Sequence, residues 1–334
     1  MAHAKPAPLL AAAGAATLAI GALALKKYLA ARRVRASDAA AMAILGERNG
    51  RMHSPESVAA GRSFATRPSD VFIVTYPKCG TTWVSAICHF LRVAEDRDAL
   101  AADFGEITEV VPWDIVAHDC GQDLDADQVA SPRLFKSHES YETVAKGGRY
   151  IYVARDPQDA FWSFYKFLPA YMQCGPLSVE CFARGIFGGL SHSGGIWTHF
   201  AGWWPRRNDA DVLWVCYENI KADPAREIRR VAAFMGVGAD DATVERVRAA
   251  TTLQAMSADG SKYDDHFVFG KLRAQMGFPA DAVHMATKVR SGQVGGSKAL
   301  PPKVARMLED RWRGTMQRRT GLGTYAELRA SVAH

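Results

Sequence analysis

The architecture of this chain follows from one segment, Val71-Phe-Ile-Val-Thr-Tyr-Pro-Lys-Cys-Gly-Thr-Thr-Trp83. Val71–Tyr76 is a largely apolar run, which is typical of a strand in a parallel sheet that is covered on both faces. A proline and a glycine then predict a tight turn before a helix that begins near Thr81. The N–H groups at the helix start, the threonine hydroxyl groups and Lys78 offer donors to an anion. The segment therefore predicts a strand, an anion-binding turn and a helix.

Three further apolar runs have the same character: Arg133–Ser137, Tyr150–Ala154 and Val212–Tyr217. Helical patterns begin near Pro157 and Pro224. Strands that alternate with helices predict an α/β fold, a single three-layer domain with a central parallel sheet and a P-loop-like phosphate-binding loop. The loop is not a Walker A motif, because Gly-Lys-Ser/Thr is missing.

Composition excludes several classes of protein. The chain has 334 residues, of which 48% are hydrophobic and 23% charged, so it is neither disordered nor collagen-like. The net charge is +6, but six of the 41 basic residues lie in the first 37 residues, which contain no acidic residue. The remainder balances at 35 basic against 35 acidic residues, so we predict no nucleic-acid partner.

The six cysteines are scattered: Cys79, Cys88, Cys120, Cys174, Cys181 and Cys216. None forms a Cys-x-x-Cys pair, and no Cys/His cluster has zinc-finger spacing. This pattern is typical of a reduced, cytosolic-type domain. We therefore expect neither a disulfide framework nor a metal.

Residues 1–36 form an apolar and basic segment that we separate from a domain at residues 37–334. Ala7–Leu25 carries no charge over 19 residues, which can just span a bilayer. Basic residues follow this run, so the positive-inside rule would keep the domain in the cytoplasm. We predict membrane association through residues 7–25; a transit peptide for an organelle and an exposed helix or tail stay open as alternatives.

Two more segments carry candidate ligand-binding residues. Tyr150–Phe167 places Arg155 at a strand end and Ser163 two turns into the following helix. A guanidinium fork suits a phosphate, because it donates two parallel hydrogen bonds. Arg290–Lys298 is rich in glycine, which lets the backbone approach a ligand closely.

Pro132–His138 is a short strand that ends in a histidine, between the two strand-to-helix junctions. Ligands of α/β sheets bind outside the carboxyl ends of the strands, which is where Lys136 and His138 would lie. A near-neutral imidazole can take a proton from a hydroxyl group. His138 is therefore a candidate general base.

Taken together and in this order, the motifs resemble those of the soluble, cytosolic-type sulfotransferases, which use 3′-phosphoadenosine 5′-phosphosulfate (PAPS) as co-substrate. The resemblance covers about residues 66–325. It implies that the first turn holds the 5′-phosphosulfate, through Lys78, Cys79, Gly80, Thr81 and Thr82. It implies that Arg155 and Ser163 bind the 3′-phosphate.

The resemblance also assigns residues to the rest of the nucleotide. Trp83 matches a tryptophan that packs on the adenine, Tyr217 matches a tyrosine that contacts the base, and Thr251 lies in another nucleotide-contacting segment. Arg290, Ser291 and Gly292 fall in the segment that closes over the nucleotide.

This chain departs from the family pattern at several positions. Cys79 stands where serine is common, and Ser137 where threonine precedes the histidine. Ser291 replaces a lysine, and Gly296-Ser297 replaces Asp-Trp. The last change would weaken closure over the nucleotide unless a neighbouring base compensates.

The reaction implied by the resemblance is the in-line transfer of a sulfuryl group from PAPS to a hydroxyl or amine of a small molecule. His138 would act as general base, and Lys78 and Lys136 would stabilise the leaving bisphosphate. Two alternatives remain: a non-catalytic, membrane-attached nucleotide-binding scaffold, and another P-loop-type nucleotide transferase.

The acceptor pocket is expected from loops at Phe104–Val129 and Tyr171–Gly195, since loops carry specificity on a fixed scaffold. Aromatic residues predict an apolar or aromatic acceptor: Trp113, Phe161, Phe164, Phe167 and Tyr171. The sequence does not predict an oligomeric state.

Overall fold

The computed structural model describes residues 8–94 and 104–332, with side chains from residue 23 onward. Its centre is one parallel sheet of four strands: β1 (Val71–Thr75), β2 (Leu134–Ser137), β3 (Arg149–Ala154) and β4 (Val212–Cys216). The strand order is β2-β1-β3-β4. Val71 lies opposite Leu134 on one side and Arg149 on the other. The predicted strands and their parallel arrangement are confirmed.

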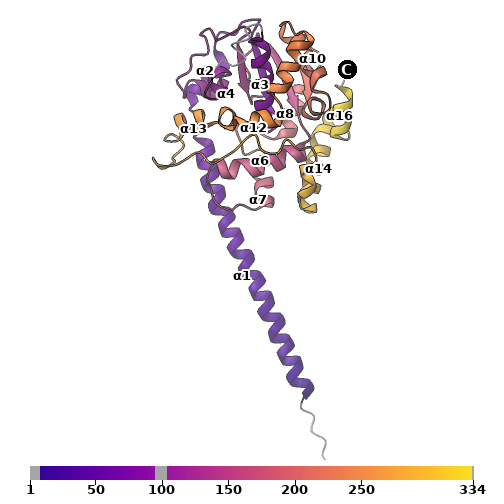
Figure 1. Cartoon of the computed structure of the whole chain (residues 1–334). Coiled ribbons are helices and arrows are strands. Elements are labelled where there is room, and N and C mark those ends of the chain that lie inside the picture. The colour runs from indigo at the N-terminus through magenta and orange to yellow at the C-terminus, as the bar shows by residue number, and fades with distance from the viewer. Residues whose placement is uncertain (1–7, 95–103, 333–334) are drawn as a thin grey trace, which may run out of the picture.

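Alternating side chains of the strands enter two separate cores, one on each face of the sheet. Ile73 and Val153 belong to one core, and Phe72 and Tyr152 to the other. Both sets are completely buried, as expected for a parallel sheet that is covered on both sides. The fold is therefore α/β with helices on both faces of the sheet (Figure 1).

The helices on the two faces come from separate parts of the chain. Those that carry residues of the Ile73 core include α3 (Thr81–Arg92), α10 (Pro224–Met235) and α11 (Asp241–Ala250). The Phe72 core receives residues from α6 (Pro157–Tyr171), α8 (Ile196–Trp203), α14 (Pro302–Trp312) and the end of α1 (Pro8–Gly50).

The remaining helices have nine residues or fewer. They are α2 (Pro55–Ser63), α4 (Ile107–Val110), α5 (Asp114–Ala117), α7 (Val179–Arg184), α9 (Tyr217–Ala222), α12 (Leu253–Ala258), α13 (His266–Leu272), α15 (Arg318–Thr320) and α16 (Tyr325–Ser331). Single turns of other helix types lie at Ile186–Gly188, Trp204–Arg206, Gly260–Tyr263, Gly296–Ala299 and Arg313–Gln317.

Helices α3, α6 and α10 begin where the sequence predicts, whereas α9 was not predicted and begins at Tyr217, which was expected at the end of β4. The carboxylate of Asp223 accepts a hydrogen bond from the backbone N–H of Arg226, and Pro224 is the first residue of α10. Asp156 caps α6 in the same way, ahead of Pro157.

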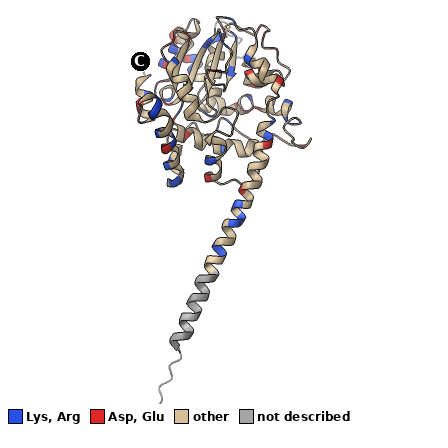
Figure 2. Ribbon diagram, turned by 180° about the vertical axis from the view of Figure 1, so that it is seen from behind, with Lys and Arg blue, Asp and Glu red and all other residues tan. Residues whose placement is uncertain are grey.

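Helix α1 extends away from the body of the protein (Figure 1). Residues 23–37 are all exposed, and Figure 2 shows Lys and Arg along this part of the helix. From residue 23 onward, Asp38 is the first residue of α1 that is partly buried, and its carboxylate accepts hydrogen bonds from the backbone and hydroxyl of Ser178 at 2.7 and 2.6 Å. The division of the chain at residue 36 stays a prediction.

The proposed membrane anchor at residues 7–25 lies mostly outside the residues whose side chains are described. Among the described residues, no helix combines the length and the apolar character that a membrane span requires. The structure therefore lends no support to a membrane span.

The six cysteines are all free, and five of them are buried.

Candidate active site

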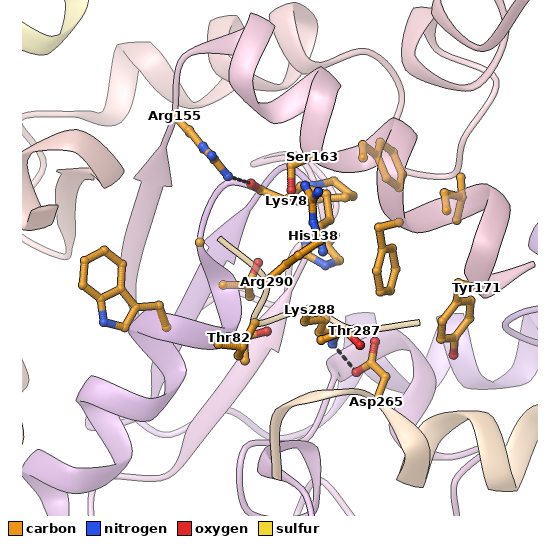
Figure 3. Close-up of a pocket in the computed structure, with 18 of the residues that line it drawn as sticks. Lys78, Thr82, His138, Arg155, Ser163, Tyr171, Asp265, Thr287, Lys288 and Arg290 are labelled. Carbon is orange, nitrogen blue, oxygen red and sulfur yellow. Dashed lines mark hydrogen bonds and ion pairs between the residues drawn. The ribbon is translucent and has the colours of Figure 1, made fainter. Parts of the chain in front are cut away.

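A cavity of about 330 Å³ opens at the carboxyl ends of the strands (Figure 3). The structure brings all but one of the candidate residues to its wall: Lys78, Gly80, Thr81, Thr82, Trp83, Lys136, His138, Arg155, Ser163, Tyr217, Thr251, Arg290, Ser291 and Gly292. They meet there because parallel strands place their carboxyl ends along one edge of the sheet.

The exception is Cys79. Its side chain is completely buried in the hydrophobic core and does not line the cavity. Its backbone N–H donates to the carbonyl oxygen of Tyr76 at 3.2 Å, within the turn between β1 and α3. Burial raises the pKa of the Cys79 thiol, so the thiol stays protonated and apolar in character. Any nucleotide contact at this position would come from the backbone.

The turn between β1 and α3 has an unusual backbone that turns the start of α3 toward the cavity. Lys78 and Gly80 have φ angles of 71° and 111°, in the left-handed region. Glycine is required at position 80 for a second reason: a Cβ atom there would lie 2.9 Å from Cδ2 of Tyr217. Gly80 therefore lies against the ring of Tyr217, and the half-buried Thr82 of the following helix lines the same cavity.

Arg155 connects two parts of the cavity wall. Its guanidinium donates to the carbonyl oxygen of Lys78 at 3.0 Å and to that of Gln293 at 3.1 Å. The same group lies 4.3 Å from the ring centre of Tyr217. Ser163, from the second turn of α6, lines the cavity nearby (Figure 3). Arg155 thus connects the turn between β1 and α3, the C-terminal segment that contains Gln293 and the ring of Tyr217.

His138 follows the last residue of β2 and is only 6% exposed. Its Nδ1 atom lies 2.8 Å from the carbonyl oxygen of Thr75 and 3.2 Å from the hydroxyl of the same residue. Burial, reinforced by the charge of Lys136, lowers the pKa of His138 well below its usual range. The imidazole is therefore neutral at physiological pH, as a general base must be.

The lysines of the site are held in apolar and acidic surroundings. Lys136 lies 3.9 Å from the ring of Trp113, and Lys78 lies 3.8 Å from the ring of Phe167. Burial lowers the pKa of Lys136 to about 8 and the pKa of Lys78 well below its usual value. Both amines would regain their full charge beside a bound anion.

Sequence reasoning missed two charged residues beside Lys136 in the cavity, Asp265 and Lys288. The carboxylate of Asp265 forms an ion pair with Lys288, and its Oδ1 atom lies 3.7 Å from Nζ of Lys136. Both residues come from irregular parts of the C-terminal region, where no periodic pattern marks them. Burial alone would raise the pKa of Asp265, but the two lysines hold it well below its usual range.

Two aromatic rings form a further wall. The rings of Trp83 and Tyr217 meet edge to face, with 5.3 Å between their centres. The indole N–H of Trp83 donates to the carbonyl oxygen of Thr251 at 2.9 Å. This arrangement leaves aromatic surface beside the first turn, which suits a planar base.

Arg290, Ser291 and Gly292 belong to an irregular segment that runs past the cavity, and the first two are exposed. The end of this segment is tied to α6. The buried carboxylate of Asp159 accepts hydrogen bonds from the backbone N–H groups of Gly295 and Ser297 at 2.6 and 2.8 Å. Asp159 was not singled out from the sequence.

The Gly296-Ser297 pair has a local explanation. A Cβ atom at Gly296 would lie 3.3 Å from Cδ1 of Trp162, so glycine leaves room for this tryptophan of α6. The backbone N–H of Ser297 takes part in the contact with Asp159. The segment is therefore anchored through main-chain groups, whatever the side chains at these two positions.

The two loops predicted for the acceptor pocket both line the cavity, together with a part of the chain that was not predicted. The expected loops contribute Trp113 and Ile115, and Tyr171 and Met172. Phe164 and Phe167 also line the cavity, whereas Phe161 is completely buried in the core. The unexpected wall comes from the end of α1 and the residues after it: Asn49, Met52 and His53.

Comparison with known proteins identifies the family. The family model described as "Sulfotransferase domain" matches residues 68–318. Human sulfotransferase 1C2 is 29% identical over 202 residues, which cover 58% of this chain and 68% of that protein. Sulfotransferase 1 family member D1 of Rattus norvegicus is 30% identical over 207 residues, or 60% of this chain and 70% of that protein.

Solved structures share the fold. Retinol dehydratase, in complex with androsterone and the inactive cofactor PAP, superposes with a TM-score of 0.63 at 17% identity, covering 80% of this chain and 87% of that one. Mouse sulfotransferase SULT7A1, in complex with PAP, has a TM-score of 0.60 at 20% identity, with 85% and 95% coverage. Because the family model covers most of the chain, the resemblance noted from the motifs is confirmed: the chain belongs to the sulfotransferase family and is a transferase.

Proposed function

We propose that this protein transfers the sulfuryl group of PAPS to a hydroxyl or amine of a small-molecule acceptor, with His138 as general base. The observation that carries the proposal is the geometry of His138, whose Nδ1 faces the carbonyl of Thr75. A carbonyl can only accept, so Nδ1 is the donor and Nε2 keeps its lone pair. This neutral base lines the same cavity as Lys78, Lys136 and Arg155.

The cavity fits a nucleotide with anionic groups at both ends. Arg155, with Ser163 beside it, offers a fork of donors to the 3′-phosphate. The turn at Lys78 and the start of α3 offer donors to the 5′ end, as a P-loop-like phosphate site would. Trp83 and Tyr217 supply an aromatic surface for the base.

PAPS supplies an activated sulfuryl group with the bisphosphate as its leaving group. Nε2 of His138 takes the acceptor proton as the acceptor oxygen forms its bond to sulfur. The bond between sulfur and the 5′-phosphate oxygen breaks, and its electron pair stays on the bisphosphate. Lys78 and Lys136 stabilise that charge, so the chain works by positioning and electrostatics and needs no covalent enzyme intermediate.

We propose an apolar or aromatic acceptor. Trp113, Phe164, Phe167 and Tyr171 support this proposal, because they give one side of the cavity an apolar lining. The relative retinol dehydratase is seen with androsterone and with retinol. A cytoplasmic location belongs to the same proposal, and is supported by a relative named cytosolic sulfotransferase 1 in Danio rerio.

The test begins with thermal unfolding of the full chain with adenosine 3′,5′-bisphosphate, beside ATP as control. At about 100 times the dissociation constant, a ligand stabilises by about 2.7 kcal/mol, which raises the unfolding temperature by several degrees. Stabilisation by ATP alone would favour another P-loop-type transferase.

The second step follows transfer of labelled sulfate from PAPS to a panel of phenols, steroids and aliphatic alcohols. Turnover of one acceptor class is expected. Binding of the bisphosphate without turnover of any acceptor, and without any consumption of PAPS, would favour the non-catalytic scaffold.

A further inference from the structure

Lys288 is a buried cation that the motifs of this chain do not include. It lies in the irregular segment between α13 and the turn at Gly296–Ala299, with a side chain only 10% exposed. Figure 3 shows Lys288 and Thr287 inside the cavity, with Lys288 directed at Asp265. Its neighbours Arg290 and Ser291 are exposed. The covering segment therefore inserts one ammonium group into the site.

Three lysines share one end of the cavity. Asp265 is 3% exposed, and its Oδ1 atom contacts Lys288 and lies 3.7 Å from Nζ of Lys136. Lys288 is also the charged group that lowers the pKa of Lys78 most, after burial itself. The ammonium groups of all three lysines therefore act on one another electrostatically, within reach of a single carboxylate.

The buried carboxyl groups near the three lysines differ in how readily they ionise. Glu106 and Asp114 are buried carboxyl groups that also interact with this cluster, and burial raises the pKa of both. The three lysines thus share one carboxylate, Asp265, whose pKa they lower, and burial in turn lowers the pKa of Lys78 and Lys136. Buried charges are stable when they are paired, so a further anion would stabilise the three ammonium groups.

We propose that Lys288 is a third lysine of the transfer centre and that it donates to the 5′-phosphate end of the donor nucleotide. This inference rests on the proposed function. An ammonium group has three donors, and the contact with Asp265 uses one of them. Asp265 thereby holds Lys288 in place while leaving donors for the ligand.

The placement of Lys288 favours a contact with the 5′-phosphate end of the nucleotide over a contact with its 3′-phosphate. Lys288 and its partner Lys136 both act electrostatically on His138, the base of the proposed reaction, which lines the same cavity. Arg155, the candidate 3′-phosphate ligand, lies on the other side of the cavity in Figure 3. Lys288 therefore adds charge stabilisation where the leaving bisphosphate gathers its negative charge. Lys288 therefore does not take over the role of the family's lysine at the position where this chain has Ser291.

The experiment measures binding of three nucleotides to the full chain by calorimetry: adenosine 3′,5′-bisphosphate, adenosine 3′-phosphate and adenosine 5′-phosphate. In Lys288→Met we expect the bisphosphate and the 5′-phosphate to bind about tenfold more weakly, and the 3′-phosphate to bind as before. Lys288→Arg keeps most of the affinity. Lys271→Met, at an exposed lysine of α13, changes none of the three.

Three results would overturn the inference. One is equal bisphosphate affinity in the wild type and Lys288→Met, and another is a loss confined to the 3′-phosphate. The third is recovery of wild-type affinity in Lys288→Met/Asp265→Asn, because Lys288 would then only neutralise Asp265. If the wild type itself fails to bind the bisphosphate, the proposed function fails as well, and the two failures are thereby distinguished.

Discussion

The Nδ1 atom of His138 lies 2.8 Å from the carbonyl oxygen of Thr75, at the end of the neighbouring strand β1. Because these two strands are paired in parallel, their ends lie together and the contact fixes the imidazole tautomer. The atom left to accept a proton is Nε2, and the ring lies edge to face against Trp113, with 5.1 Å between ring centres. A backbone acceptor thus orients the proposed base.

The first prediction concerns the loss of this base. His138→Ala lowers kcat for sulfuryl transfer by about 10²–10⁴-fold, the range for a positioned general base, and leaves the affinity for adenosine 3′,5′-bisphosphate unchanged. Steady-state kinetics and calorimetry measure the two quantities. His118→Ala, at an exposed histidine, is the control. Near-normal turnover of His138→Ala would refute the assignment.

A second prediction concerns how kcat/KM changes as the pH is lowered. Burial and Lys136 lower the pKa of His138, so the base stays unprotonated below the usual histidine value of about 6.5. We expect kcat/KM to stay level from pH 7 to pH 6 and to fall only at lower pH. A fall in kcat/KM whose midpoint lies at pH 6.5 or above would contradict this prediction.

The alkaline side of nucleotide binding gives a third prediction. The pKa of Lys136 is lowered to about 8 in the free protein, and a bound anion raises it. Binding therefore takes up a proton above pH 8, and the affinity for the bisphosphate falls as the pH rises through 8. Calorimetry in buffers of different ionisation enthalpy measures the proton uptake. Constant affinity between pH 7 and pH 9.5 would argue against this coupling.

Gly80 carries the fourth prediction. Its φ of 111° and the 2.9 Å approach of a Cβ atom to Tyr217 make Gly80→Ala destabilising by about 1–3 kcal/mol in the free energy of unfolding. Chemical denaturation measures the change. In Gly270→Ala, a Cβ atom meets nothing within 4 Å inside α13, so the same substitution stabilises by up to about 1 kcal/mol. Equal effects at the two glycines would contradict the strain argument.

Asp159 underlies the fifth prediction. Its two oxygens accept hydrogen bonds from the backbone N–H groups of Gly295 and Ser297, so Asp159→Asn removes a charged acceptor. We expect amide hydrogen exchange at these two residues to speed up about tenfold or more. Asp281→Asn, at an exposed carboxylate, is the matched variant. If exchange at Gly295 and Ser297 were unaffected by Asp159→Asn, the segment would be held by other contacts.

Much of the sheet and of one side of the cavity could be predicted from the sequence. Continuous apolar runs mark strands that are buried on both faces, and caps such as Asp223 mark helix starts. The carboxyl ends of parallel strands share one edge, which is why Lys78, His138 and Arg155 could be expected together.

Other parts of the cavity carry no such signal. Asp265 and Lys288 lie in irregular segments, so no periodicity points to their meeting with Lys136. Helical spacing alone did not separate Phe161, which faces the core, from Phe164, which also lines the cavity. These contacts depend on tertiary packing that a linear pattern does not encode.

Helix α1 has a geometric consequence for any attachment of this protein. From Leu23 to Asn49, at the cavity wall, the helix rises by about 39 Å, given 1.5 Å for each residue. The exposed residues 23–37 account for about 21 Å of this length, so Leu23 lies well beyond the point at which Asp38 contacts the body of the protein. Since Asn49, Met52 and His53 line the cavity, α1 links any attachment at its far end directly to the cavity wall.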